Sequence, residues 1–141
     1  MNMTAVSTPE SLVESRMNAF EQGDFGLVYD SYHIESPFLQ HFLDKSDYLT
    51  FADQQLGGIV LADWKMFGQR QINDHTVEVL LWMQMGEGAE ELDLFEMALL
   101  LLTKSGWRYH SAQKLTREDY GGAFDQIDFC HFDQATEKIR F

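Results

Sequence analysis

The chain has 141 residues with 23 acidic and 10 basic side chains, so its formal net charge is −13. Hydrophobic residues make up 45% of it, which predicts one globular domain and excludes a chain that is disordered throughout. The negative charge argues against nucleic acid and anionic membrane surfaces as partners, because both repel an acidic protein. No apolar run approaches the roughly 18 residues of a membrane span. The single cysteine allows no internal disulfide, and the polar amino-terminal segment does not resemble a signal peptide, so we expect a cytoplasmic protein.

The first third of the chain predicts helices. Ser7, Pro9 and Glu10 form a helix start signal, and apolar side chains then recur at helical spacing as far as the stop signal at Gly23. We therefore expect a helix over residues 9–22, preceded by a flexible segment over residues 1–8. Further helix starts are predicted at Asp24, Ser36-Pro37 and Ser46-Asp47. Four short helices thus precede the first strand.

From Ile59 onward the pattern changes to strands. Four are expected, over residues 59–70, 75–86, 92–104 and 107–115, separated by turn signals rich in Asn, Asp, Ser and Gly. The third strand is apolar on both faces, so each face needs a cover. Helices can cover one face, and either a second subunit or the tail over residues 116–141 covers the other. Apolar side chains interrupt this otherwise polar tail, among them Tyr120, Phe124, Ile127, Phe129, Phe132 and Phe141.

Helices followed by a long antiparallel meander predict an α+β fold, in which N-terminal helices pack in a cone formed by the curved sheet. We expect one domain over residues 9–115 and a tail that packs on this domain or on a partner subunit. Because large exposed apolar patches are rare in monomers, the two apolar faces of the third strand predict a homodimer through the open sheet face.

Two short motifs near the start resemble a known family. Residues 15–20 (SRMNAF) with Gly23-Asp24, followed by Ser31-Tyr32-His33, resemble the start of the middle domain of YchJ-type bacterial proteins. Glu96 and Trp107-Arg108-Tyr109 resemble the acidic strand residue and the tryptophan-tyrosine strand of the same family. The resemblance covers residues 10–115.

The resemblance implies the nuclear transport factor 2-like fold, also called cystatin-like or SnoaL-like. Its members include isomerases, dehydratases, cyclases and epoxide hydrolases as well as plain binding or dimerisation modules, and YchJ-type proteins themselves imply no activity. Longer family members carry cysteine-rich, zinc-binding SEC-C segments, which the single cysteine of this chain makes impossible. Neither a metal nor a cofactor is expected.

Glu96 and Arg16 are lone charges in apolar surroundings. Glu96 lies in a row of leucine and alanine on its strand, and Arg16 lies on the apolar face of the first helix. Because a bare buried charge costs several kcal/mol, each needs a partner. We expect an ion pair in which the two side chains are hydrogen-bonded or within one water of each other. The alternative is a wet cavity in which Glu96 is a general acid or base and Arg16 binds an anionic ligand, and Glu96 exposed at a strand end is the third reading.

No complete catalytic set is apparent, and Glu96 and His33 are the only candidates. His33 is expected near the end of the second helix, where it either transfers protons beside Glu96 or caps helix carbonyls. For the tryptophans Trp64 and Trp82 three positions are expected as alternatives: the wall of a ligand pocket, the hydrophobic core or a dimer interface. The expected ligand-binding residues are Arg16, Tyr32, His33, Trp64, Trp82 and Glu96.

The sequence is compatible with two functions. One is a small hydrophobic-ligand pocket between sheet and helices, and the other is a non-catalytic dimeric scaffold or protein-interaction module. A cavity of a few hundred cubic ångströms beside Glu96 would favour the first function, and a filled site would favour the second.

Overall fold

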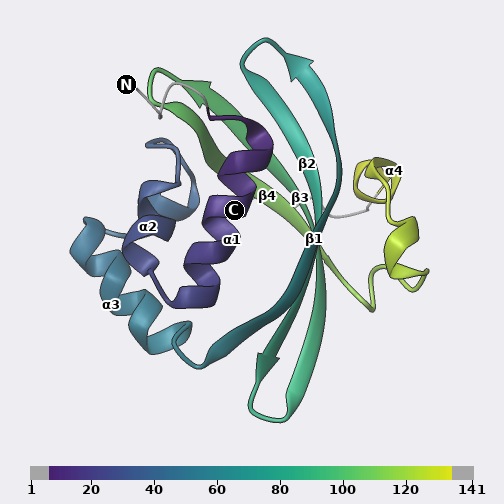
Figure 1. Cartoon of the computed structure of the whole chain (residues 1–141), viewed down its shortest axis with the longest axis horizontal. Helices are drawn as coiled ribbons and strands as arrows, with labels where there is room; N and C mark the ends of the chain where they lie inside the picture. Colours follow the sequence, from purple (N-terminus) through teal and green to yellow (C-terminus); the bar gives the residue numbers. More distant parts are fainter. Residues whose placement is uncertain (1–6, 135–141) are drawn as a thin grey trace.

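The computed structural model describes residues 7–134 and places helices on one side of a curved sheet (Figure 1). The helices are α1 (Pro9–Gln22), α2 (Phe25–Asp30), the 3-10 helix η2 (Phe38–His41) and α3 (Lys45–Gln55). The strands are β1 (Ile59–Asn73), β2 (Thr76–Glu87), β3 (Glu90–Thr103) and β4 (Gly106–Thr116), followed by η3 (Phe124–Gln126) and α4 (Phe129–Asp133). Among the described residues, no helix is long and apolar enough to cross a membrane.

Helix α1 has the predicted bounds but a different cap. Thr8 is the N-cap: its hydroxyl accepts a hydrogen bond from the Ser11 amide (3.0 Å), and the Ser11 hydroxyl accepts one from the Thr8 amide (2.7 Å). The predicted cap at Ser7 is wrong, because the Ser7 hydroxyl accepts from the Trp107 amide of β4 instead (3.0 Å). The predicted flexible segment mostly lies outside the described residues, and its last two members, Ser7 and Thr8, are both hydrogen-bonded.

The remaining helix signals are partly right. Asp24 caps α2 as predicted, by accepting from the Leu27 amide (3.1 Å). The helix expected after Pro37 is only the 3-10 helix η2, because Phe42 adopts an extended conformation. Helix α3 starts with Asp44 as its N-cap rather than at Ser46, since the Asp44 carboxylate accepts from the Asp47 amide (2.9 Å).

The four strands form the predicted antiparallel meander, in the order β1-β2-β3-β4. Three register shifts interrupt the pairing of the edge strand β1 with β2, and bulges of this kind bend a strand and strengthen its twist. A further shift between Leu99 and Leu100 interrupts the pairing of β3 with β4. The sheet therefore curves around α1, as Figure 1 shows.

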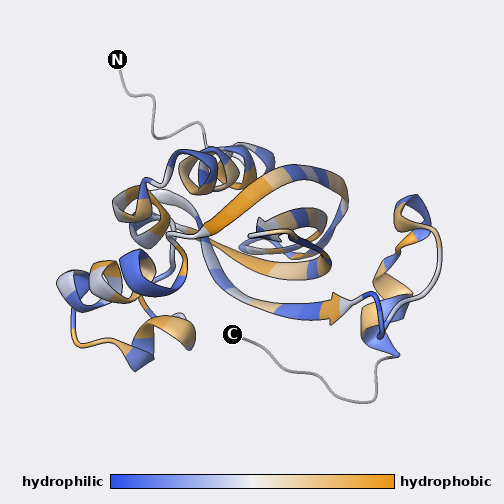
Figure 2. Cartoon of the chain, turned by 90° about the horizontal axis from the view of Figure 1, so that it is seen from below, coloured by the Kyte–Doolittle hydropathy of each residue, from blue (hydrophilic) through white to orange (hydrophobic). Residues whose placement is uncertain are grey.

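Both faces of the sheet are covered within the single chain. On the helix side, the core contains Leu12, Val13 and Met17 of α1 with Val79, Leu81 and Leu100 of the sheet. On the opposite side, the buried residues Trp82, Phe95 and Met97 pack against Tyr120, Ile127 and Phe132 of the tail. Figure 2, seen from below, shows the same separation of tail and helices. Of the two covers considered for this face, the tail is the one the described residues supply.

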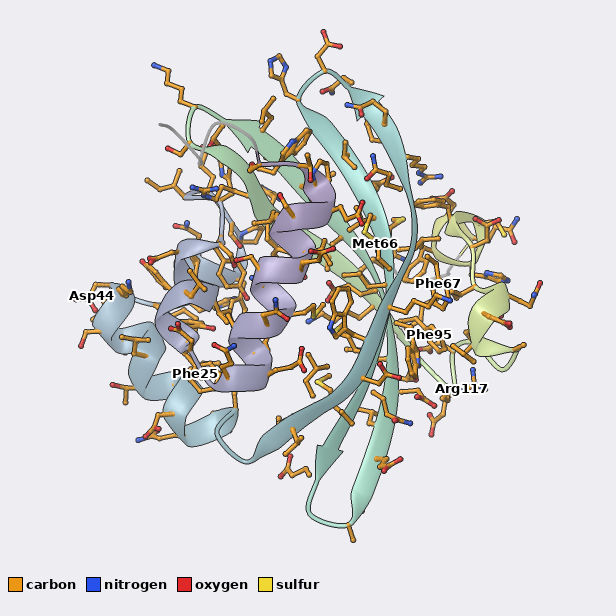
Figure 3. The ribbon with its side chains drawn as sticks, in the orientation of Figure 1. Phe25, Asp44, Met66, Phe67, Phe95 and Arg117 are labelled. Carbon is orange, nitrogen blue, oxygen red and sulfur yellow. The ribbon has the colours of Figure 1, made fainter. Side chains whose placement is uncertain are left out.

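An ion network attaches the tail to the sheet. The guanidinium of Arg70 on β1 donates to Glu78 of β2 (2.8 Å) and to both carboxylate oxygens of Asp133 in α4 (2.8 and 2.9 Å). The same guanidinium lies 4.5 Å from the ring centroid of Phe129. Figure 3 shows Phe95 and Arg117 on this tail side of the sheet, whereas Phe25 lies among the helices.

Candidate functional site

A cavity of about 350 Å³ lies between the helices and the helix-facing side of the sheet. Most of its lining is aromatic or aliphatic, including Phe20, Phe25, Phe38, Phe51, Met83 and Leu94. The polar side chains that line it are Arg16, Tyr32, Tyr48, Glu96, Tyr109 and Lys114. These polar residues come from α1, the segment after α2, α3, β3 and β4, so only the folded chain assembles the site.

Arg16 is buried, with 7% of its surface exposed, and is held by neutral groups. Its Nη1 donates to the Ser31 hydroxyl (2.7 Å) and its Nη2 donates to the Tyr32 hydroxyl (3.0 Å). The guanidinium carbon lies 3.8 Å from the ring centroid of Tyr109 and 4.4 Å from that of Tyr32. Backbone bonds from Tyr109 to Ser31 (2.9 Å) and from His33 to Tyr109 (2.8 Å) hold these partners beside β4. The cation therefore lies against two aromatic rings that are nearly perpendicular to one another (89°).

Glu96 is also buried, with 5% of its surface exposed. Its carboxylate lies beside the Tyr109 side chain, whose pKa it raises, and 3.9 Å from the ammonium of Lys114, its direct partner across the β3-β4 pairing. The side chain of Lys114 is 39% exposed, so this end of the cavity reaches solvent. Glu96 thus faces the cavity rather than an exposed strand end.

Arg16 and Glu96 form no direct ion pair among the described residues, and an approach within one water of each other stays a prediction. Arg16 donates to Ser31 and Tyr32, while Glu96 interacts with Tyr109 and Lys114. The two charges still attract one another through space. The direct pair does not form because Arg16 and Glu96 each have partners on other elements. The residue pattern of one helix or one strand does not reveal such partners.

Burial and neighbouring charges shift the ionisation of this cluster. Burial raises the pKa of Tyr109 well above its usual value, and the negative charge of Glu96 raises it further. Burial alone would lower the pKa of Arg16, but its interactions with Tyr32, Tyr109 and Glu96 outweigh this effect and raise it. Burial also raises the pKa of Tyr48. Near neutral pH, the cluster therefore holds neutral tyrosines beside a charged arginine.

The structure brings three of the six expected ligand-binding residues together. Arg16, Tyr32 and Glu96 line the cavity, but His33, Trp64 and Trp82 are not among its lining residues. Trp82 lies on the tail side, where its indole donates to Asp93 (3.1 Å). Trp64 of the edge strand packs partly buried against the main core.

His33 follows α2 by three residues, along the edge of β4. Its Nδ1 accepts from the Glu35 amide (3.0 Å), and its ring centroid lies 5.8 Å from that of His110. It is therefore placed outside the cavity and does not adjoin Glu96 there. Among the described residues, no three His, Cys, Asp or Glu side chains are grouped so that they could hold a metal ion.

Sequence reasoning missed Tyr109 and Lys114 as site residues. A hairpin register counted from the turn pairs Thr103 with Gly106 and would pair Glu96 with Gln113. The register shift between Leu99 and Leu100 makes His110 an extra residue of β4 and moves Lys114 opposite Glu96. The available signal was Lys114 itself: it carries the charge opposite to that of Glu96 and directly follows Gln113, the partner expected without a register shift.

Comparisons with known proteins extend this description. No protein-family model matches the chain, and no curated protein matches it. A SEC-C motif containing protein from Rhodopseudomonas palustris has a similar structure, with a TM-score of 0.58 and 15% identity over 75% of this chain and 77% of that one.

Two further solved structures are similar. A ketosteroid isomerase-like protein from Erwinia carotovora atroseptica has a TM-score of 0.60 and 14% identity, over 82% of this chain and 98% of that chain. A domain of unknown function with a cystatin-like fold from Nostoc punctiforme has a TM-score of 0.59 and 14% identity, over 86% and 90% respectively.

This chain has a cystatin-like α+β fold. The fold class predicted from the order of helices and strands is confirmed, and the similar structures fit the cystatin-like fold that the resemblance implies. In this cystatin-like fold, the cavity lies between the inner side of the sheet and the helices. At 14% to 15% identity, these likenesses show the fold alone, and fold does not imply function.

Proposed function

We propose that the protein binds a small, mostly apolar molecule in the cavity beside Glu96. The observation that carries this proposal is the cavity itself: its volume of about 350 Å³ falls within the range of small-molecule sites. Protein interiors are packed about as densely as organic crystals, so a space of this size is not an ordinary packing defect. A filled site would have favoured the dimeric scaffold instead.

The lining supports the same proposal. Aromatic and aliphatic side chains supply most of the surface, and a few polar groups adjoin one another through Arg16, Tyr109 and Glu96. Such a combination gives affinity from apolar burial and orientation from polar contacts. The partly exposed side chain of Lys114 lies at the end of the cavity that solvent can reach. We propose binding and assign no reaction, because the fold accommodates many.

A pair of tryptophan substitutions on one strand tests the proposal. Leu94 lines the cavity, whereas Leu92 lies two residues away on the same face of β3 and is 50% exposed. We expect a panel of neutral naphthalene, indole and decane alcohols to include a ligand that saturates the wild-type protein, followed by amide NMR shifts at cavity residues. Leu94→Trp should abolish this binding and Leu92→Trp should preserve it. Equal binding by Leu94→Trp would contradict the proposal.

Two finer proposals concern kinship and location. We propose that the chain is related to the YchJ-type middle domain, which is supported by the gathering of Arg16, Tyr32, Glu96 and Tyr109 from the resembling segments around one cavity. A SEC-C motif containing protein among the similar structures is consistent with this relation.

We also propose a cytoplasmic location, supported by the single cysteine, Cys130, which is exposed and free.

A further inference from the structure

The charges that line the cavity do not cancel. Arg16 and Lys114 are cations, and Glu96 is the only carboxylate among the described lining residues. Glu96 is already engaged by Lys114 and Tyr109, whereas the two hydrogen bonds of Arg16 go to neutral hydroxyls. Among the lining residues, cations therefore outnumber carboxylates by one, inside a protein whose net charge is −13.

Arg16 retains capacity for an acceptor. A guanidinium has five N–H donors, and two of those of Arg16 bond to Ser31 and Tyr32 among the described residues. The planar fork of a guanidinium matches the two oxygens of a carboxylate better than it matches a single acceptor. Because a buried charge without a counterion is costly, an anion beside Arg16 would be stabilised by more than a neutral group of the same shape.

We propose that the ligand carries one carboxylate, which Arg16 binds and the charge of Lys114 supports, with an aromatic or aliphatic body in the apolar part of the cavity. This inference rests on the proposed function and names the chemical class of its ligand. One carboxylate balances the excess charge of the cavity. A neutral ligand leaves the excess in place, and a cationic ligand increases it.

The acidic surface does not conflict with an anionic ligand. At physiological ionic strength, charges in solvent are screened over about 8 Å, whereas charges inside a cavity are screened much less. The groups that line the cavity therefore determine its preference, and the net charge of −13 mainly slows the approach of an anion.

The experiment compares two ligands that differ in charge but hardly in shape. Naphthalene-2-carboxylate and naphthalene-2-carboxamide are titrated into the full chain near neutral pH by calorimetry. We expect the carboxylate to bind at least about tenfold more tightly, because a hydrogen bond between two charged groups is about twice as strong as a neutral one in a desolvated site.

Charge-removing variants locate the preference. Lys114→Gln should reduce it several-fold, whereas Lys104→Gln, which removes the same charge from the exposed turn between β3 and β4, should leave it unchanged. Arg16→Met should remove the preference altogether, with circular dichroism confirming that this variant is folded. If it does not fold, the Lys114→Gln and Lys104→Gln comparison still decides.

The outcomes separate the two proposals. Equal or tighter binding of the carboxamide by the wild-type protein would overturn the carboxylate proposal and leave the binding function standing. A carboxylate preference that Lys114→Gln retains in full would overturn it too, because the anion would then lie elsewhere. Binding of neither compound, together with failure of the neutral panel, would overturn the binding function itself.

Discussion

The guanidinium of Arg16 lies against the rings of Tyr109 and Tyr32, and Glu96 forms an ion pair with Lys114. This arrangement changes what a substitution should cost. Had Arg16 and Glu96 formed a direct buried pair, removing either partner would leave the other uncompensated, at about 3 to 5 kcal/mol. Here Arg16 keeps its hydrogen bonds to Ser31 and Tyr32 when Glu96 is replaced, and Glu96 keeps its ion pair with Lys114 when Arg16 is replaced.

A double-mutant cycle measures the coupling of these residues. We expect Arg16→Met and Glu96→Gln to be nearly additive, with a coupling free energy of about 1 kcal/mol or less, because the two side chains share no hydrogen bond. Urea unfolding of the wild type, both single variants and the double variant gives the value. A coupling near 3 kcal/mol would mean that the direct ion pair forms in solution.

Tyr109 should make stability depend on pH in the alkaline range. Its pKa is raised in the folded protein, mainly by burial, while in the unfolded chain it is about 10. Above that pH the unfolded chain loses a proton that the folded chain keeps, so the free energy of unfolding falls as pH rises. Each pH unit beyond the unfolded pKa costs about 1.4 kcal/mol until the folded pKa is reached.

Tyr109→Phe tests this dependence. Between about pH 8 and pH 11, its free energy of unfolding should fall by about 1 kcal/mol less than that of the wild type, since one of the buried phenols is gone. Tyr48→Phe should behave in the same direction, because burial also raises the pKa of Tyr48. Parallel pH profiles for the wild type and both variants would show that these phenols ionise freely in the folded protein.

At the scale of elements, Arg70 joins three parts of the chain. It connects β1 to Glu78 of β2 and to Asp133 of α4, and these interactions raise its pKa, with the hydrogen bond to Asp133 the largest cause. The side chain is 36% exposed, so solvent screening reduces the value of the network relative to a fully buried one. Its main effect is to hold α4 against the sheet.

Two substitutions separate the contacts of Arg70. We expect Arg70→Gln to lower the free energy of unfolding by about 1 to 2 kcal/mol, and Asp133→Asn by less than about 1 kcal/mol, because the second change leaves the Arg70-Glu78 pair intact. Hydrogen exchange at α4 should accelerate in both variants. Unchanged exchange in Arg70→Gln would show that the apolar contacts of Phe132 alone hold this helix.

At the scale of the whole molecule, the homodimer stays a prediction. Its original reason was the second apolar face of β3, and in the described chain Tyr120, Ile127 and Phe132 of the tail pack on that face. A dimer through this surface would therefore compete with the tail. Association is favoured where an apolar face is open, so access to Phe95 and Met97 should control it.

Sedimentation velocity at tens of micromolar measures the association directly. We expect a chain that ends at residue 116 to associate more strongly than the full chain, because its truncation exposes Trp82, Phe95 and Met97. The dimer prediction itself requires a two-chain species for the full protein. A full chain that sediments as a monomer, beside a truncated chain that self-associates, would show that the tail satisfies the face instead.

The sequence by itself determined the order and type of the elements. Helical spacing with caps such as Asp24 specified the first third, and alternation interrupted by turn residues specified the meander, because these signals act between neighbours in the chain. It also singled out Arg16 and Glu96, since a charge in an apolar row is visible without a structure. Tyr32 was recognised through its motif.

The tertiary structure decided how these residues meet. One extra residue of β4, His110, changes the β3-β4 register so that Lys114 rather than Gln113 faces Glu96, and no local signal specifies where such a bulge falls. Packing of segments distant in sequence placed Tyr109 over Arg16 and turned Trp82 toward the tail. Periodicity tells which residues share a face, but the cavity volume and each buried charge's partner depend on contacts between elements, which form only when the whole chain packs.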